Sequence, residues 1–193
     1  RFTVLVEGRE YARVELSVPG RHNMLNALAC CAAAEFLGVP GAAAEKGLNK
    51  FTGSSRRFQL VGKMPNGATV VDDYAHHPSE MKATLMTAKE MRFDRILCAF
   101  QPHTYTRTKA LFPEFVEALK LCDQAVLAPI YAAREQNTVG VYSSDLAKEV
   151  PGAVAFDSFE EIADYLRGEA GPNDLVLTMG AGNINQVGPM LIK

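Results

Sequence analysis

Short aliphatic and β-branched runs alternate with longer stretches of helical periodicity from about residue 62 to the end of the chain. The runs have the length of buried strands, and the stretches between them repeat apolar residues every three or four positions. Strands are predicted at residues 68–72, 95–100, 124–128, 153–156 and 175–178. Helices are predicted at residues 79–91, 108–121, 143–149, 158–167 and 184–191. This alternation predicts an α/β fold, a Rossmann-like and mostly parallel sheet with helices on both faces.

The residues before this region have a different pattern. Residues 2–6 and 11–18 are rich in strand formers and flank a turn that contains Gly8, which predicts a β-hairpin. A helix that ends near Gly38 follows, and a second short helix is predicted at 42–50. The first of these helices is expected to bury one apolar stripe, made of Leu25, Leu28, Ala29, Ala32 and Phe36.

We place a domain boundary near Gly62, after a polar loop that covers residues 52–57. The chain is therefore expected to contain two parts, residues 1–61 and residues 62–193. It begins with Arg1 directly before a strand-like run, and we expect it to be an excised piece of a longer protein.

The composition restricts the class of protein. Of the 193 residues, 48% are hydrophobic and 22% are charged, with a formal net charge of −2. The pI is about 6.1, and this balance argues against a nucleic acid or an acidic membrane surface as partner. No signal peptide or apolar run of transmembrane length is present, so a cytoplasmic protein is expected. The four cysteines form no CxxC pair, which favours buried reduced thiols. Nothing in the sequence sets an oligomeric state.

Polar side chains follow four of the predicted strands, with the sequences DDYAHH, QPH, PIY and GAGN. The carboxyl ends of parallel strands open on one edge of a sheet, and open α/β folds bind their ligands there. The sequence therefore predicts a single polar binding cleft at this edge.

The carboxylates of Asp72 and Asp73 have several possible roles. Such a group at a strand end can hold Mg²⁺, accept hydrogen bonds from ribose hydroxyls or act as a base. Alternatively, one of them caps the helix that begins near Pro78. A zinc site with His76, His77 and His103 is conceivable, but the spacing matches no zinc motif, and one of the adjacent histidines is expected to be structural.

Cationic and amide side chains are further candidates. Arg107 and His103 could bind a carboxylate, because guanidinium presents a matching fork of donors. Asn23 and Asn26 lie three residues apart on one helix face and suit the edge of adenine, although Asn23 could simply be a helix N-cap. In the polar loop, Arg56 and Arg57 could reach a phosphate or remain solvated.

The glycine-rich turn at residues 180–183 joins a strand to a helix and could accept a phosphate. The dinucleotide fingerprint needs glycine at the position of Asn185, so a nicotinamide-linked oxidoreductase is a weak alternative.

Taken in order, five segments resemble the Mur ligase family and cover nearly the whole chain. They are PGRHNMLNALA, RRF, VVDDYAHHP, FQPHTYTRT and TMGAGNI. The resemblance is strongest to the members that join L-alanine to UDP-N-acetylmuramate, and it implies that these two compounds are the substrates. By the same resemblance, residues 1–61 are the end of a central ATP-binding domain and the rest is the carboxyl-terminal Rossmann-like domain.

The resemblance also implies roles for individual residues. Asn23 and Asn26 correspond to adenine contacts, Arg57 to an ATP phosphate contact and Asp73 to a ribose contact. Tyr74, His76, His103 and Arg107 correspond to the residues that meet the amino acid and the muramyl group; of these, His76, His103 and Arg107 are the expected catalytic residues. This chain departs from the resemblance at Thr104, where related alanine-adding ligases often have arginine, so the resemblance implies no second cationic contact at this position.

The resemblance implies ATP and Mg²⁺ as cofactors. The chain itself has no G-x-x-G-K-[ST] phosphate loop; this loop, the metal ligands and a modified lysine are expected before Arg1. We therefore expect the fragment to be inactive alone. Two alternatives within the fold are a murein-peptide recycling ligase and a non-catalytic nucleotide-binding module.

Overall fold

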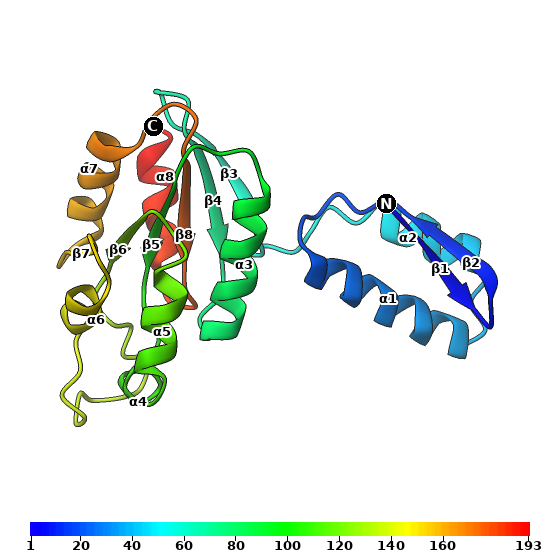
Figure 1. Cartoon of the computed structure of the whole chain (residues 1–193), viewed down its shortest axis with the longest axis horizontal. Coiled ribbons are helices and arrows are strands. Elements are labelled where there is room, and N and C mark those ends of the chain that lie inside the picture. Colours follow the sequence, from blue (N-terminus) through cyan, green and yellow to red (C-terminus); the bar gives the residue numbers. More distant parts are fainter. The chain divides into compact units, whose positions relative to one another are not determined.

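The computed structural model describes residues 1–193, which form two compact units, Arg1–Ser54 and Ser55–Lys193 (Figure 1). The boundary predicted from the sequence at Gly62 lies inside strand β3 (Gln59–Lys63). Because β3 pairs with β4 of the second unit, residues 55–61 belong to that unit and not to the first. None of the helices combines the length and the apolar composition needed to span a bilayer.

The first unit contains the predicted hairpin and two helices. Strands β1 (Phe2–Val6) and β2 (Arg9–Val14) pair antiparallel. Glu7 and Gly8 connect them at φ of 50° and 77°, the left-handed conformation that tight hairpin turns need. Helices α1 (Arg21–Phe36) and α2 (Gly41–Asn49) follow.

The face of α1 that is buried in this unit differs from the predicted one. Cys31 packs with the hairpin, and Ala27 is also buried, whereas Leu25, Leu28 and Phe36 are exposed. The sequence of α1 has alanine, cysteine and leucine on more than one face. The periodicity therefore predicts the helix correctly, but not which of its apolar faces meets the hairpin.

The second unit is built on a six-stranded sheet in the order β3-β4-β8-β5-β6-β7. The pairs from β4 to β7 are parallel, and only β3 runs antiparallel at an edge. The strands after β3 lie where the sequence predicts them: β4 (Thr69–Asp73), β5 (Ile96–Phe100), β6 (Gln124–Leu127), β7 (Val154–Ala155) and β8 (Leu175–Met179). Strand β3 is not predicted from the sequence because its residues do not alternate between buried and exposed positions, and its register with β4 shifts between Leu60 and Gly62.

Most helices also match their predictions. The helices of this unit are α3 (Pro78–Glu90), α4 (Tyr105–Ala110), α5 (Phe112–Leu119), α6 (Ser143–Glu149), α7 (Phe159–Glu169), the 3₁₀ helix η1 (Ile184–Gln186) and α8 (Val187–Leu191). The single helix predicted at 108–121 is two helices, which break at Leu111 with φ of −113°. Pro113 explains the break, since it has no N–H to continue the hydrogen bonds of α4 and favours the first turn of a new helix.

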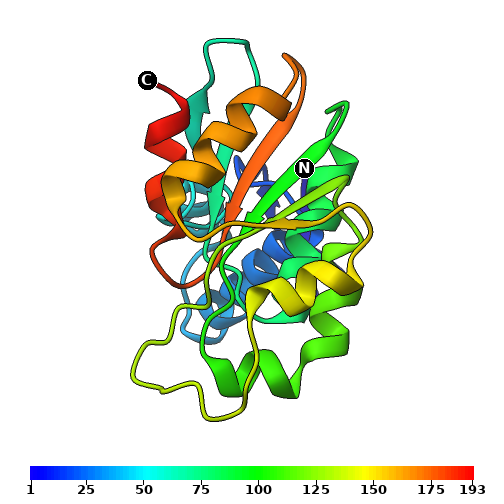
Figure 2. The ribbon, with the colours of Figure 1, turned by 90° about the vertical axis from the view of Figure 1, so that its left-hand side faces the viewer.

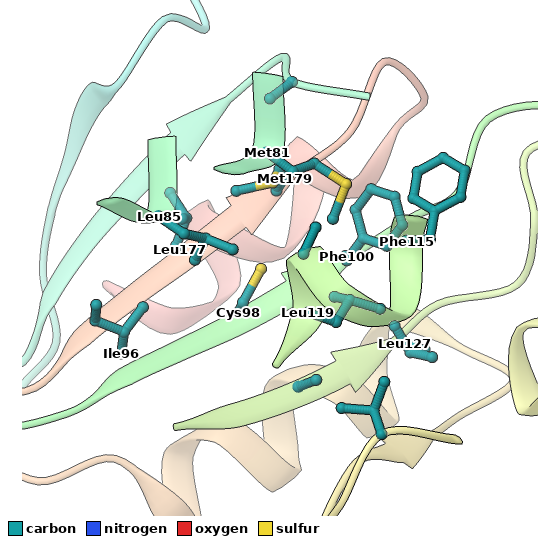
Figure 3. Packing of buried hydrophobic residues seen from close by; sticks show 14 of the residues in the cluster. Met81, Leu85, Ile96, Cys98, Phe100, Phe115, Leu119, Leu127, Leu177 and Met179 are labelled. Carbon is teal, nitrogen blue, oxygen red and sulfur yellow. The ribbon is translucent and has the colours of Figure 1, made fainter. Parts of the chain in front are cut away.

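Two apolar layers enclose the sheet. Side chains of β5 alternate between them: Cys98 and Phe100 join the layer under α3, α5 and α6, and Leu97 and Ala99 join the layer under α7 and α8. Figure 2 shows these helix groups on opposite sides of the sheet. Phe100 and Phe115 pack against each other in the first layer with ring centroids 5.6 Å apart (Figure 3).

The order of the strands determines which strand ends lie next to one another. The chain leaves β4 and crosses to β5, and β8 later fills the position between them. The exits of β4, β8, β5 and β6 are thus neighbours at one edge, as the sequence predicts. In open α/β sheets, ligands usually bind at the carboxyl ends of the strands, where the strand order switches direction.

Candidate functional site

Four aromatic side chains line up across the sheet edge. Tyr74 and His76 follow β4 with ring centroids 5.7 Å apart, and His76 lies 6.0 Å from His103, which follows β5. His103 in turn stacks on Tyr131, which follows β6, at 5.5 Å and 26°. We call Tyr74, His76, His103, Tyr131 and the nearby Arg107 of α4 the strand-exit cluster. The structure thus brings together Tyr74, His76, His103 and Arg107, the residues that the family resemblance assigns to the substrate side.

Two polar atoms of this cluster are buried without a hydrogen-bond partner, His103 Nδ1 and Arg107 Nη1. An orphaned buried donor costs about 1–3 kcal/mol, more when it is charged. An unpaired buried polar group in a native structure calls for an explanation, such as a catalytic role or an ion or water that completes it. An anion with planar oxygens, such as a carboxylate, matches the guanidinium fork.

The electrostatics of His103 follow from the same neighbours. Burial, together with the positive charges of Arg107 and His76, lowers the pKa of the His103 imidazole. The ring is therefore neutral at pH 7, and one of its nitrogens can accept a hydrogen bond while the other donates.

We expect NMR titration of this chain to place the pKa of His103 below the ordinary value of about 6.5. The four histidines can be assigned by single substitution. Arg107→Gln should raise the pKa of His103, because it removes a repelling charge, and Arg92→Gln at an exposed position should not. A His103 pKa at or above the ordinary value of about 6.5 would contradict this electrostatic description. Since the folded pKa lies below the unfolded one, His103 protonation should destabilise the fold as the pH falls below about 6.5.

Asp72 and Asp73 are both buried at the end of β4, but they have different surroundings. The Asp72 carboxylate accepts from Arg56 Nε at 2.8 Å and from Thr178 Oγ1 at 2.6 Å, so it is a structural group. Asp73 accepts from the backbone N–H of Phe58 at 2.9 Å and of Ala75 at 2.8 Å. Burial raises the pKa of Asp73, against these hydrogen bonds. The Thr84 side chain also hydrogen-bonds this carboxylate, and the lone pair that remains could accept from a ligand hydroxyl.

The two adjacent histidines divide as the sequence suggests. His77 is the N-cap of α3, and its Nδ1 accepts from the Ser79 backbone N–H at 3.3 Å. Glu80 completes this capping box and also lies 3.3 Å from His76 Nδ1. His77 is thus the structural member, and the alternative that an aspartate caps this helix is wrong.

The loop from β6 to α6 supplies residues that sequence reasoning missed. Tyr131 exchanges backbone hydrogen bonds with Pro102 at 2.8 Å and Thr104 at 2.9 Å. Glu135 accepts from the Thr106 backbone N–H at 2.9 Å, which ties the loop to the first turn of α4, just before Arg107. Figure 2 shows this loop at the same end of the sheet as α4. No local pattern marks Glu135, because its partner lies 29 positions away.

Gln101 is a second missed residue, and it explains the glycine-rich turn. Its Oε1 accepts from the backbone N–H groups of Asn183 at 2.9 Å and Ile184 at 3.1 Å. A Cβ on Gly182 would lie 2.3 Å from that oxygen. The glycine is therefore needed for the close approach of Gln101, and the amides that a dinucleotide phosphate would use are occupied. This arrangement argues against the oxidoreductase alternative.

Asn23 and Asn26 lie in the first unit, on the first turns of α1. The N-cap is Gly20, so the interpretation of Asn23 as the cap is wrong. Asn23 Nδ2 instead donates to the Pro19 carbonyl at 2.6 Å, which leaves its side-chain oxygen without an assigned partner. Asn26 is exposed.

Arg57, the expected phosphate contact, is exposed, with its guanidinium carbon 5.9 Å from the centre of the Tyr74 ring. The neighbouring Arg56 has its side chain turned inward, toward Asp72. Concerning metals, no three or more His, Cys, Asp or Glu side chains gather where they could hold an ion. Because Asp72 and Asp73 already accept from protein donors, the residues present do not form a Mg²⁺ site.

Comparison with known proteins agrees with this geometry. The family model for the Mur ligase glutamate ligase domain matches residues 56–182. UDP-N-acetylmuramate–L-alanine ligase of Agathobacter rectalis is 48% identical over 196 aligned positions, which cover 100% of this chain and 42% of that protein. The chain thus spans less than half the length of this relative.

Solved structures of Mur ligases also match this chain. The UDP-N-acetylmuramate-alanine ligase of Thermotoga maritima superposes with a TM-score of 0.77 at 31% identity, covering 96% of this chain and 40% of that one. A murein peptide ligase of Psychrobacter arcticus has a TM-score of 0.65 at 26% identity, covering 92% of this chain and 38% of that one. The family model that matches residues 56–182, the matched fold and the identity along the full chain together mean that this chain belongs to the Mur ligase family.

Proposed function

We propose that this chain is the carboxyl-terminal part of an ATP-dependent ligase that joins L-alanine to UDP-N-acetylmuramate. The best support is the 48% identity to such a ligase along 100% of the chain. The strand-exit cluster supports it independently, because the unpaired Arg107 Nη1 is a donor suited to a small carboxylate substrate and lies in the same cluster as His103.

The proposed chemistry proceeds in two steps. A muramyl carboxylate oxygen attacks the γ-phosphorus of ATP, so that ADP leaves and an acyl phosphate forms. The amine of L-alanine then attacks the acyl carbon, phosphate leaves, and the amine gives up a proton as the amide forms. Both steps depend mostly on positioning and on stabilising negative charge.

We assign the nucleotide to Asn23, Asn26, Arg57 and Asp73. The two carboxamides offer donors and acceptors for adenine, Arg57 offers a flexible exposed cation for phosphate, and Asp73 offers a lone pair for ribose. Mg²⁺ would accompany ATP, but no step is assigned to it here because these residues do not form a site for it.

We assign the amino acid and the muramyl group to the strand-exit cluster. Arg107 would pair with a substrate carboxylate, with the neutral His103 beside it as a further donor. Tyr74 and His76 would line the side of this substrate site that lies across from Arg107. The buried position of Arg107 Nη1 should strengthen this pairing, since solvent screens it less. As ATP and nucleotide sugars are cytoplasmic metabolites, we expect a cytoplasmic enzyme.

The test is a turnover assay on the full-length protein that contains this chain. With ATP and UDP-N-acetylmuramate, we expect ADP release to depend on L-alanine and to exceed the rate with an alanyl-glutamyl-diaminopimelyl tripeptide at least about 100-fold. A preference for the tripeptide would support the murein-peptide ligase instead. ATP binding without turnover would support a non-catalytic module. The 193-residue chain alone should show no turnover, because its sequence contains no phosphate loop.

A further inference from the structure

Arg56 is the residue that joins the two halves of the proposed site, and its side chain is mostly buried, with 21% exposed. Its guanidinium donates in three directions. Nε bonds the Asp72 carboxylate at 2.8 Å, Nη1 bonds the Gly182 carbonyl at 3.0 Å and Nη2 bonds the Gly180 carbonyl at 2.7 Å. One side chain thus ties together the loop before β3, the end of β4 and the turn after β8.

Arg56 also holds Tyr74 from two sides. The Tyr74 backbone N–H donates to the Arg56 carbonyl at 2.7 Å. The guanidinium carbon of Arg56 lies 4.9 Å from the centre of the Tyr74 ring, within the range of a cation–π contact. The Arg56 backbone has φ of 57°, a strained conformation for a residue other than glycine, which persists only where the surroundings enforce it.

The adjacent arginines therefore differ in what they contact. Arg57 is exposed and lies 5.9 Å from the Tyr74 ring centre. Arg56 uses its donors on the protein and faces no free anion. Arg56 contacts Asp72, which precedes the proposed ribose contact Asp73 in the chain. It also contacts Tyr74, which belongs to the proposed amino-acid side.

We propose that Arg56 is a positioning residue that sets the orientation of Tyr74 and so connects the nucleotide and amino-acid sides of the site. The effect of Arg56 on the reaction with L-alanine rests on the proposed function. The claim that Arg56 orients the Tyr74 ring does not. Lysine cannot replace Arg56, because one ammonium point charge cannot reach three acceptors that a planar fork reaches.

The structural part is tested by NMR of ¹³C-tyrosine in the 193-residue chain, which has six tyrosines. Tyr74→Phe assigns the resonance. Arg56→Lys should shift and broaden the ring signals of Tyr74, whereas Arg92→Lys should leave them in place. An unmoved Tyr74 signal in a folded Arg56→Lys chain would overturn the proposal.

Loss of the guanidinium could unfold the chain, because it leaves the Asp72 carboxylate buried without its ion pair. A second variant, Arg56→Met with Asp72→Asn, removes both charges together. If Arg56→Lys does not fold, the Tyr74 signal is read in this double variant, with the same expected shift and the same contradicting result.

The catalytic part is tested by kinetics of the full-length protein. Arg56→Lys should lower kcat/KM for L-alanine about tenfold or more, and this loss should largely disappear in a Tyr74→Ala background, because coupled residues are not additive. A full additional loss in that background would overturn positioning through Tyr74. If the unaltered protein shows no L-alanine-dependent turnover, the proposed function fails while the NMR result still decides the structural proposal.

Discussion

Arg107→Ala in the full-length protein is expected to lower kcat/KM for L-alanine by about 10²–10³-fold, the range seen when one preorganised charge-stabilising donor is lost. The reason is the buried and unpartnered Arg107 Nη1, which no other side chain can replace in the strand-exit cluster. Steady-state kinetics with each substrate varied in turn would measure the effect, and the KM for ATP should stay nearly unchanged.

Matched variants make this result specific. Arg107→Lys keeps the charge but not the fork, so it should recover only part of the activity. Arg92→Ala, at an exposed arginine, should behave like the unaltered protein. Asp73→Ala should give the opposite pattern, with a raised KM for ATP. A loss confined to ATP affinity in Arg107→Ala would remove Arg107 from the amino-acid side.

Phe100→Ala is expected to destabilise the second unit of this chain by about 3–5 kcal/mol, the usual cost of truncating a buried phenylalanine. Phe100 is 0% exposed and packs on Phe115 in the apolar layer of Figure 3. Its strand β5 also leads directly into Gln101 and His103, so a cavity here would loosen the site. Urea unfolding followed by circular dichroism would measure the change.

The matched control is Phe36→Ala, where the same side chain is 86% exposed in this chain. It should change the free energy of unfolding by less than about 0.5 kcal/mol. Equal effects of the two substitutions would contradict the description of the core. A changed denaturant slope in Phe100→Ala would indicate that the unfolding is no longer two-state.

Local patterns predicted most of the second unit correctly. The apolar runs locate β4, β5, β6 and β8, because a strand buried on both faces needs uninterrupted apolar residues. The polar exits of these strands then predicted where Tyr74, His76 and His103 meet, since parallel strands end at one edge. These conclusions need only the chain direction and the residue types.

Other parts of the site depend on contacts between distant residues. Gln101 bonds backbone amides 82 and 83 positions away, and Arg56 bonds carbonyls 124 and 126 positions away. In sequence, Arg56 and Arg57 are indistinguishable neighbours. Only the fold shows that Arg56 holds the framework while Arg57 stays exposed.

The family resemblance placed Tyr74, His76, His103 and Arg107 on one side of the site. The sequence pattern by itself determined the α/β class and the shared edge of the strand exits. Periodicity and strand polarity are local properties, and they suffice for that. The tertiary structure decided which face of α1 is buried in this unit, where the second unit begins, and which polar groups are already occupied. Those outcomes depend on hydrogen bonds and packing across many residues, and a local pattern does not encode which partner satisfies each group.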